Sequence, residues 1–316
     1  MRPVTALIAI PLLAASAGIA AEVDARRVPT FETGVEVVNL NVAVSGRGDR
    51  FVTDLEESNF EVFEDGVRQS LSLCTRQSLP LSVVLLIDAS GSMLPKMAAA
   101  QAAATRLVAR LRPDDEVEVV QFSGRTVVKE PFTTDRARAE AAIQSTVPEG
   151  DTALYDTLYI ALKELQPLAS AEPMRRFAIV LLSDGRDTTS LNGEEEVLEL
   201  ARRSAVSIQA VSLPGEVGTA DPLELRRVRH FLTELTRVTG GFAHFPERLQ
   251  DLEPLYGRIA EGLRSQYSIA YVPEPRRQDG GWRQIAVIVR GRTDVSVRHK
   301  PGYYAPKPRR SARSGR

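Results

Sequence analysis

Uninterrupted apolar runs, each ending in polar residues, are the most regular feature of this sequence. Residues 81–92 read LSVVLLIDASGS, and residues 178–185 read AIVLLSDG. Such a run, closed by turn residues, is typical of a strand buried on both faces of a parallel sheet. Segments with helical spacing separate and follow these strands; they are residues 96–112, 134–145, 152–165, 194–204, 223–239 and 249–264. This alternation predicts an α/β fold with a doubly wound, mostly parallel sheet.

Four shorter strand-like segments complete the predicted sheet, which then has six strands. They are residues 117–122, 126–132, 206–213 and 242–245. The first two form a pair around residues 123–125, so we expect one antiparallel strand at the edge of the sheet.

Alternation of apolar and polar residues is found at both ends of the chain instead. It covers residues 35–44, 60–63 and 67–74 at one end, and residues 267–272, 284–289 and 294–299 at the other. Three antiparallel strands cannot bury a face alone, so each set needs the other. We predict a flanking antiparallel β-domain built from both chain ends, residues 29–79 and 265–305, with an α/β domain of residues 80–264 inserted between its halves.

The two termini carry signals of their own. Residues 1–21 contain one basic residue, a long apolar segment and small residues before a cleavage point, which predicts a secretory signal peptide; an uncleaved membrane anchor is the alternative. Residues 306–316 form a basic tail that we predict to be disordered. We expect a secreted, periplasmic or cell-envelope protein with no stable membrane insertion after signal cleavage.

The charge balance and the cysteine content exclude two features, attraction to nucleic acid and a disulfide within the chain. The chain has 40 Lys and Arg residues against 41 Asp and Glu residues, so no electrostatic attraction to nucleic acid is expected. Cys74 is the only cysteine, so a single chain forms no disulfide and depends on packing for its stability.

The candidate chemistry lies where the buried strands end. Asp88, Ser90 and Ser92 follow the first run, Asp184 follows the second, and Thr152 begins a helix after a glycine turn. Ligands bind at the carboxyl edge of open α/β sheets. Carboxylate and hydroxyl oxygens without nearby Cys or His suit Mg²⁺ or Mn²⁺ rather than zinc. The alternative for the serines alone is that Ser90 or Ser92 caps the helix beginning near residue 95.

These five residues resemble the metal-ion-dependent adhesion site of von Willebrand factor type A (VWA) domains. The flanking sequences EDGVRQ and KPGYYAP are similar to those of secreted bacterial proteins of this superfamily. The resemblance implies one Mg²⁺ or Mn²⁺ ion, direct ligation by Ser90, Ser92 and Thr152, and contacts from Asp88 and Asp184 partly through water. It also implies a protein partner that presents an acidic side chain to the ion.

We therefore predict an exported, divalent-metal-dependent adhesion or scaffold module rather than an enzyme. A structural envelope protein with a vestigial site is one alternative, and a metal-dependent hydrolase is another. The sequence has no Asp-x-Asp pair, phosphate-binding loop or Gly-x-Ser-x-Gly elbow, and its three histidines stand near no motif. Asp151 adds a carboxylate that would tighten metal binding if it faced the ion. Pro95 and Lys96 stand where integrin β-subunits carry acids, so a second, adjacent ion is not expected.

Overall fold

The computed structural model describes residues 37–307 apart from 77–78, 185 and 214–220. The predicted signal peptide, residues 1–21, and most of the predicted basic tail, residues 306–316, lie outside the described residues. No helix in the described part of the chain is long and apolar enough to cross a membrane. The described residues belong to one folded unit that starts at Glu36.

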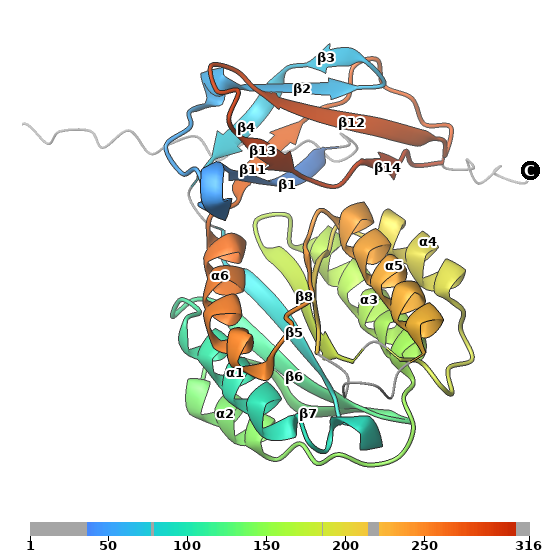
Figure 1. Cartoon of the computed structure of the whole chain (residues 1–316). Coiled ribbons are helices and arrows are strands. Elements are labelled where there is room, and N and C mark those ends of the chain that lie inside the picture. Colours follow the sequence, from blue (N-terminus) through green and yellow to red (C-terminus); the bar gives the residue numbers. More distant parts are fainter. Residues whose placement is uncertain (1–36, 77–78, 185, 214–220, 308–316) are drawn as a thin grey trace, which may run out of the picture. The chain divides into compact units, whose positions relative to one another are not determined.

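A six-stranded sheet forms the centre of the α/β domain, in the order β10-β9-β8-β5-β6-β7 (Figure 1). Its strands are β5 (Leu81–Asp88), β6 (Glu116–Phe122), β7 (Thr126–Thr133), β8 (Arg176–Ser183), β9 (Ser207–Ser212) and β10 (Ala243–His244). All neighbours pair in parallel except β7, which is antiparallel to β6. Every residue of β5 is buried, as expected for a strand with helices on both faces. The predicted doubly wound, mostly parallel sheet with an antiparallel edge strand is confirmed.

Helices cover both faces of this sheet and divide the core in two (Figure 1). On one face lie α1 (Met97–Ala109), α2 (Arg136–Gln144) and α6 (Leu252–Arg264), and on the other lie α3 (Leu154–Ala171), α4 (Glu194–Arg203) and α5 (Pro222–Thr239). Successive residues of β5 point to opposite faces, so Val83 and Leu85 belong to the first core and Val84 and Leu86 to the second. The two helical layers therefore hold the end of β5 in a fixed position.

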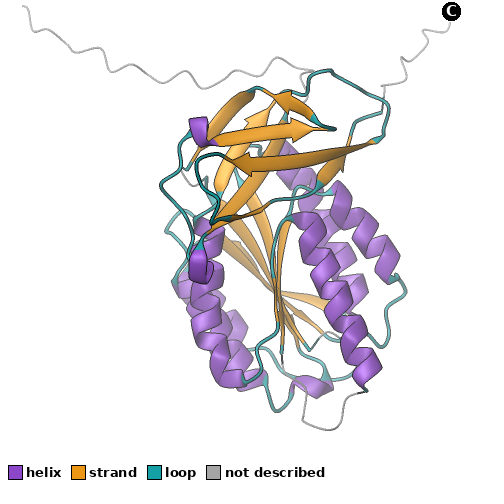
Figure 2. Ribbon diagram, turned by 45° about the horizontal axis from the view of Figure 1, so that its top comes forward, coloured by secondary structure: helices purple, strands orange, loops and turns teal. Residues whose placement is uncertain are grey.

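Two four-stranded antiparallel sheets form the β-domain (Figure 2). One has the order β13-β1-β11-β4 and the other the order β14-β12-β2-β3. The strands are β1 (Val38–Ser45), β2 (Phe60–Glu64), β3 (Val67–Gln69), β4 (Leu71–Thr75), β11 (Tyr267–Tyr271), β12 (Trp282–Val289), β13 (Ser296–Arg298) and β14 (Gly302–Tyr304). Strands from both chain ends pair with each other, as β1 does with β11 and β2 with β12. The prediction that both ends build one antiparallel β-domain is confirmed, and the two sheets share one apolar core.

Residues 67–74 are not the single strand that their alternation predicts. β3 pairs with β2 through a turn at Asp65 and Gly66, whereas β4 pairs with β11 in the other sheet. The chain crosses from one sheet to the other at Ser70, and the alternation continues through this crossing without showing the break. β14 is also absent from the sequence prediction, because a strand of three residues is too short to show a period.

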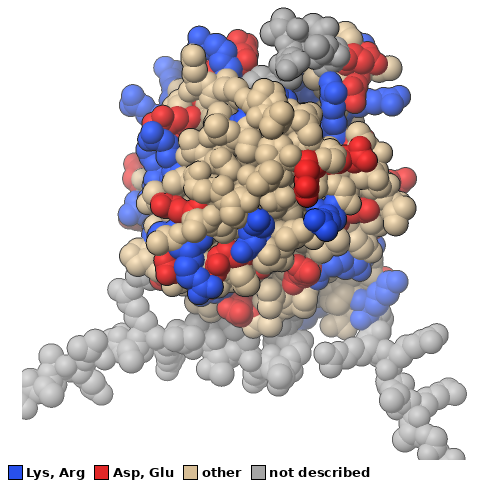
Figure 3. Space-filling model, turned by 90° about the horizontal axis from the view of Figure 1, so that it is seen from below, with Lys and Arg blue, Asp and Glu red and all other residues tan. Residues whose placement is uncertain are grey.

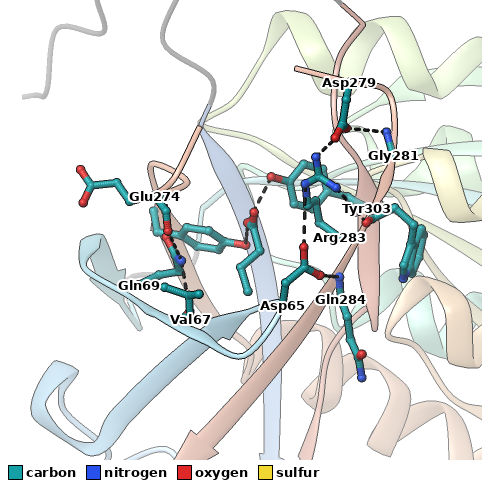
Figure 4. A network of polar contacts seen from close by, with 12 residues as sticks. Asp65, Val67, Gln69, Glu274, Asp279, Gly281, Arg283, Gln284 and Tyr303 are labelled. Carbon is teal, nitrogen blue, oxygen red and sulfur yellow. Dashed lines mark hydrogen bonds and ion pairs between the residues drawn. The ribbon is translucent and has the colours of Figure 1, made fainter. Parts of the chain in front are cut away.

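A network of polar contacts connects strands of the two β-domain sheets (Figure 4). The Glu64 carboxylate accepts hydrogen bonds from the Tyr271 hydroxyl at 2.8 Å and the Tyr303 hydroxyl at 3.1 Å. Burial, together with the neighbouring Glu64 carboxylate, holds the pKa of Tyr271 well above its usual range. Beside them the Arg283 guanidinium lies 4.0 Å from the Asp65 carboxylate. These contacts join the first half of the β-domain to the second.

Candidate metal centre

The predicted site residues lie at the carboxyl edge of the central sheet. Asp88 is the last residue of β5, and Asp184 directly follows β8, the parallel neighbour of β5. Thr152 precedes the start of α3 at Leu154. Asp88, Asp184 and Thr152 are all buried. Buried polar groups need partners, and the loops at this edge supply them.

The Asp88 carboxylate organises the loop after β5. Its Oδ1 accepts a hydrogen bond from the Ser90 backbone N–H at 2.9 Å, and its Oδ2 accepts one from the Ser183 hydroxyl at 2.5 Å. The turn brings the hydroxyl oxygens of Ser90 and Ser92 to 3.1 Å from each other. Ser90 is buried and Ser92 is exposed, so this pair of oxygens is open to solvent on one side.

Neither serine caps the helix that follows. Ser90 precedes the short 3-10 helix η3 (Gly91–Met93), but its side chain makes no capping hydrogen bond. The residue at the N-cap position of α1 is Lys96. The capping alternative is therefore wrong, and both hydroxyls keep lone pairs for a ligand.

Thr152 is held between the other two loops by hydrogen bonds. The Gly91 N–H donates to the Gly150 carbonyl at 2.9 Å, and this bond connects the loop before Thr152 to the loop after β5. On the other side, the Thr188 N–H donates to the Thr152 carbonyl at 2.9 Å, and the Thr152 N–H donates to the Thr188 hydroxyl at 2.9 Å. Gly150 has a left-handed backbone with φ 70°, which lets the chain turn here. The structure thus connects the three loops that carry all five predicted residues.

The Asp184 carboxylate forms a salt bridge with the side chain of Lys96. Lys96 Nζ lies 3.2 Å from Asp184 Oδ2, and the exposed fractions of the two side chains are 7% and 6%. The Arg186 N–H is a longer donor to Oδ1, at 3.4 Å. Asp151, in contrast, is exposed.

Sequence reasoning missed two partners of the site carboxylates, Ser183 and Lys96. The parallel register that pairs Ile87 with Leu182 places the next two residues, Asp88 and Ser183, side by side, so a prediction of register would have found this contact. The Lys96 contact leaves no local signal, because 88 residues separate the lysine from its partner.

The electrostatics of this edge favour a bound cation. Burial raises the pKa of the Asp88 carboxyl to about 6, although hydrogen bonds from Ser183 and Ser90 act in the opposite direction. Burial disfavours the ionised form of this carboxyl group, and a nearby positive charge stabilises that form. Among the described residues, no cluster of three or more His, Cys, Asp or Glu side chains could hold a metal ion. The side chains that the three loops bring to this edge offer hydroxyl and carboxylate oxygens, and such a ligand set fits Mg²⁺ or Mn²⁺.

Exposed leucines lie on the loops around this edge. The exposed fraction is 71% for Leu94, which follows η3, and 96% for Leu191, whose N–H donates to Asp156 of α3 at 3.0 Å. Figure 3, which views this face of the α/β domain, shows a broad uncharged area with many of the charged side chains around it.

Comparison with known proteins assigns the elements of this edge to a family. Residues 83–186, which include most of β5, all of β8 and Asp184, match the von Willebrand factor type A domain. A UPF0353 protein of Mycolicibacterium paratuberculosis is 26% identical over 226 residues, and the match covers 66% of this chain and 66% of that protein. An uncharacterized protein of Synechocystis is 32% identical over 112 residues, which cover 34% of this chain and 26% of that protein.

Solved structures are similar to this chain at low sequence identity. A von Willebrand factor type A protein from Catenulispora acidiphila has a TM-score of 0.48 at 14% identity, covering 87% of this chain and 76% of its own. An aerotolerance-related membrane protein from Bacteroides fragilis has a TM-score of 0.45 at 17% identity, and the match covers 58% of this chain and 98% of that protein. Proximal thread matrix protein 1 from the mussel byssus, solved with a zinc-occupied MIDAS motif, has a TM-score of 0.49 at 19% identity, covering 62% and 48%. The sequence match therefore places a von Willebrand factor type A domain at residues 83–186, within the part of the chain that forms the six-stranded sheet.

Proposed function

We propose that this protein is an exported binding module that holds one divalent cation, Mg²⁺ or Mn²⁺, and captures a carboxylate of a protein partner through it. Domains of this family generally mediate metal-dependent protein interactions. The observation that carries the proposal is the junction of three connected loops, which gathers hydroxyl and carboxylate oxygens at one edge of the sheet. The residues proposed to hold the ion are Asp88, Ser90, Ser92, Thr152 and Asp184.

The hydroxyls and the carboxylates have different roles in this proposal. The oxygens of Ser90 and Ser92, 3.1 Å apart, and the Thr152 hydroxyl are the direct ligands. Both oxygens of Asp88 already accept hydrogen bonds, so this carboxylate holds the loop and supplies negative charge. When bound, the cation supplies a positive centre for one further anionic oxygen, which the partner provides.

The surface around the site suggests the character of the partner. Leu94 and Leu191 expose apolar side chains on the loops that carry or contact the site residues. A partner that inserts an acidic side chain toward the ion would place its neighbouring residues on these leucines. We therefore propose a partner surface with one acidic residue surrounded by apolar ones.

One observation favours the alternative of a structural protein with no ion at this edge. The Lys96 ammonium pairs with Asp184, and such a pair compensates a buried carboxylate without a metal. The hydrolase alternative has less support, because His299 lies in the β-domain, where it accepts from the Val287 N–H at 3.3 Å, and His230 is exposed on α5.

Partner capture by the purified protein tests the proposal. Envelope extract is passed over immobilised wild-type protein in Mg²⁺ and in chelator, and over three variants in Mg²⁺: Asp88→Ala, Thr152→Ala and Asp184→Ala. We expect partners that are held only by the wild type in Mg²⁺. Thr152→Ala should lose the partner but keep more metal than Asp184→Ala, because it removes no formal charge.

Two outcomes contradict the adhesion mechanism. Partners that bind equally well in chelator would show that the ion is not part of the contact. Metal-dependent turnover of a small ester or phosphate, abolished by Asp88→Ala, would favour the hydrolase instead.

A further inference from the structure

A buried lysine faces the candidate metal centre. Its ammonium group, Lys96 Nζ, lies 3.2 Å from Asp184 Oδ2. The backbone of this residue is fixed at the start of α1, since the Lys96 N–H donates to the Met93 carbonyl at 2.8 Å and its carbonyl accepts from the Ala100 N–H at 3.0 Å. The helix therefore holds the lysine in place, four residues after Ser92 in the same loop.

The other charged side chains next to these loops are more exposed. Asp151 is exposed, and Glu149 is exposed and lies 3.7 Å from the exposed Arg125. Water screens such groups strongly. Arg186 and Asp187, in the loop after β8, are half-buried and have opposite charges. Among the described residues, the buried charges at this edge are Asp88, Lys96 and Asp184.

The charge balance of these three groups changes what a bound cation would do. The two carboxylates contribute −2 and the lysine contributes +1, so the buried set has a net charge of −1 rather than −2. With a divalent cation the centre would reach +1, whereas without the lysine it would be neutral. A positive centre shielded from water attracts an anion much more strongly than a neutral one does.

We propose that Lys96 sets the ligand preference of this centre: it weakens the binding of the divalent cation itself and strengthens the binding of a carboxylate to the cation-loaded protein. The inference rests on the proposed function and deepens it. The lysine competes with the cation for Asp184, which lowers the affinity for the metal. It also leaves a positive charge that the carboxylate of the partner neutralises.

The test compares Lys96→Gln with two control variants. Glutamine removes the charge but keeps an N–H donor for Asp184 Oδ2. Lys96→Arg keeps the charge, and Lys163→Gln removes the charge of an exposed lysine on α3 whose Nζ lies 5.4 Å from the centroid of the Tyr159 ring. Mn²⁺ binding is measured by isothermal titration calorimetry. Acetate binding to the Mn²⁺-loaded protein is measured by water-proton relaxation, with acetamide as the neutral control, and circular dichroism in chelator checks the folding of each variant.

We expect Lys96→Gln to bind Mn²⁺ at least about tenfold more tightly than the wild type, because a positive charge beside the ion has been removed. Its loaded form should bind acetate at least about threefold more weakly, with no change for acetamide. Lys163→Gln should match the wild type in both measurements, and Lys96→Arg should show neither effect. Unchanged or weaker Mn²⁺ binding by Lys96→Gln overturns the inference, and so does unchanged acetate binding.

The outcomes separate this inference from the proposed function. If neither the wild type nor Lys96→Gln binds Mn²⁺, the metal centre itself is refuted. If the wild type binds Mn²⁺ and Lys96→Gln behaves identically, only the role of the lysine is lost. If Lys96→Gln does not fold, Lys96→Ser leaves room for water to solvate Asp184 and carries the same two expectations.

Discussion

The β-domain and the α/β domain both bury carboxylates, but they surround them differently. In the β-domain, the buried Glu64 carboxylate accepts from two tyrosine hydroxyls, and the neighbouring Asp65, which is exposed, accepts from the Gln284 N–H at 2.9 Å (Figure 4). At the sheet edge of the α/β domain, Asp88 also has two donors, but the Ser90 and Ser92 hydroxyls beside it face each other and are open to solvent on one side. The first network directs its donors to acceptors within the fold, whereas the second leaves oxygen atoms available for a ligand.

This difference separates a structural role from a binding role. The two Glu64 contacts join residues that are 207 and 239 positions apart, so they hold the halves of the β-domain together. The oxygen-rich edge of the α/β domain connects neighbouring loops and has unfavourable burial at Asp88, which a cation would relieve. We therefore expect mutations to reduce stability most in the first network and metal binding most in the second.

Removal of the Glu64 carboxylate should have the largest effect on stability. Glu64→Ala removes the acceptor of the buried Tyr271 hydroxyl and one acceptor of the half-buried Tyr303 hydroxyl, and we expect it to lower the free energy of unfolding by about 3 kcal/mol. Glu64→Gln keeps an acceptor oxygen and should lose less than half of this. Urea denaturation in chelator measures both variants. Equal stability of Glu64→Ala and the wild type would contradict the structural role of this network.

Divalent metal should stabilise the protein through the other network. At Mn²⁺ or Mg²⁺ concentrations of a hundred times Kd, the gain for a single site is about 2.7 kcal/mol, or a rise in Tm of about 5 to 10 °C. Differential scanning calorimetry of the wild type and Asp88→Ala, with metal and with chelator, measures this shift. The variant should show no rise in Tm. An equal rise in both proteins would place the metal elsewhere.

Lys300 is a half-buried charge that donates a hydrogen bond to a carbonyl rather than to a carboxylate. Its Nζ donates to the Ser204 carbonyl at 3.0 Å, and burial lowers the pKa of Lys300 from 10.5 to about 8. The unfolded chain keeps this proton to a higher pH, so folding is penalised below pH 8, and the penalty disappears as the pH rises toward 10.5.

As the pH rises from about 7.5 to about 9.5, we expect the free energy of unfolding to increase by about 2 kcal/mol, because this penalty is lost. Lys300→Met should remove the increase. Urea denaturation at several pH values compares the two proteins. If the free energy of unfolding changes with pH in the same way in both proteins, burial does not lower the pKa of Lys300.

The smallest effect is expected from the leucines at the rim of the candidate metal centre. Leu191→Ala should leave stability within about 0.5 kcal/mol of the wild type and leave Mn²⁺ affinity unchanged, because the side chain is exposed. It should lower the affinity for the metal-dependent partner several-fold, as measured by surface plasmon resonance with the captured partner protein. Leu168→Ala, an exposed leucine near the other end of α3, is the matched control and should have no effect on any of the three measurements.

The central sheet and its polar edge could be predicted from the sequence because their signals are local. Long apolar runs define β5 and β8, and Asp88 and Asp184 stand directly at their ends. The structure brings these two carboxylates and the loop of Thr152 to one edge. Their role as metal ligands stays a prediction, as do the domain limits derived from the sequence.

The parts that sequence reasoning missed depend on contacts between distant residues. The fold brings Lys96 to Asp184 across 88 positions of sequence, and the crossing at Ser70 depends on which sheet each strand joins. Neither feature changes the local pattern of apolar and polar residues. The same holds for Tyr303, whose contact with Glu64 requires the two ends of the chain to have met.

Anomalous diffraction from a crystal soaked in Mn²⁺ tests the central claim most directly. We predict one anomalous peak at the carboxyl edge of the sheet, about 2.0 to 2.2 Å from the hydroxyl oxygens of its ligands. Those ligands should include Ser90 and Ser92, and the peak should be absent from a crystal of Asp88→Ala. A soaked crystal of the wild type that shows no peak at this edge, with Lys96 still paired to Asp184, would contradict the account.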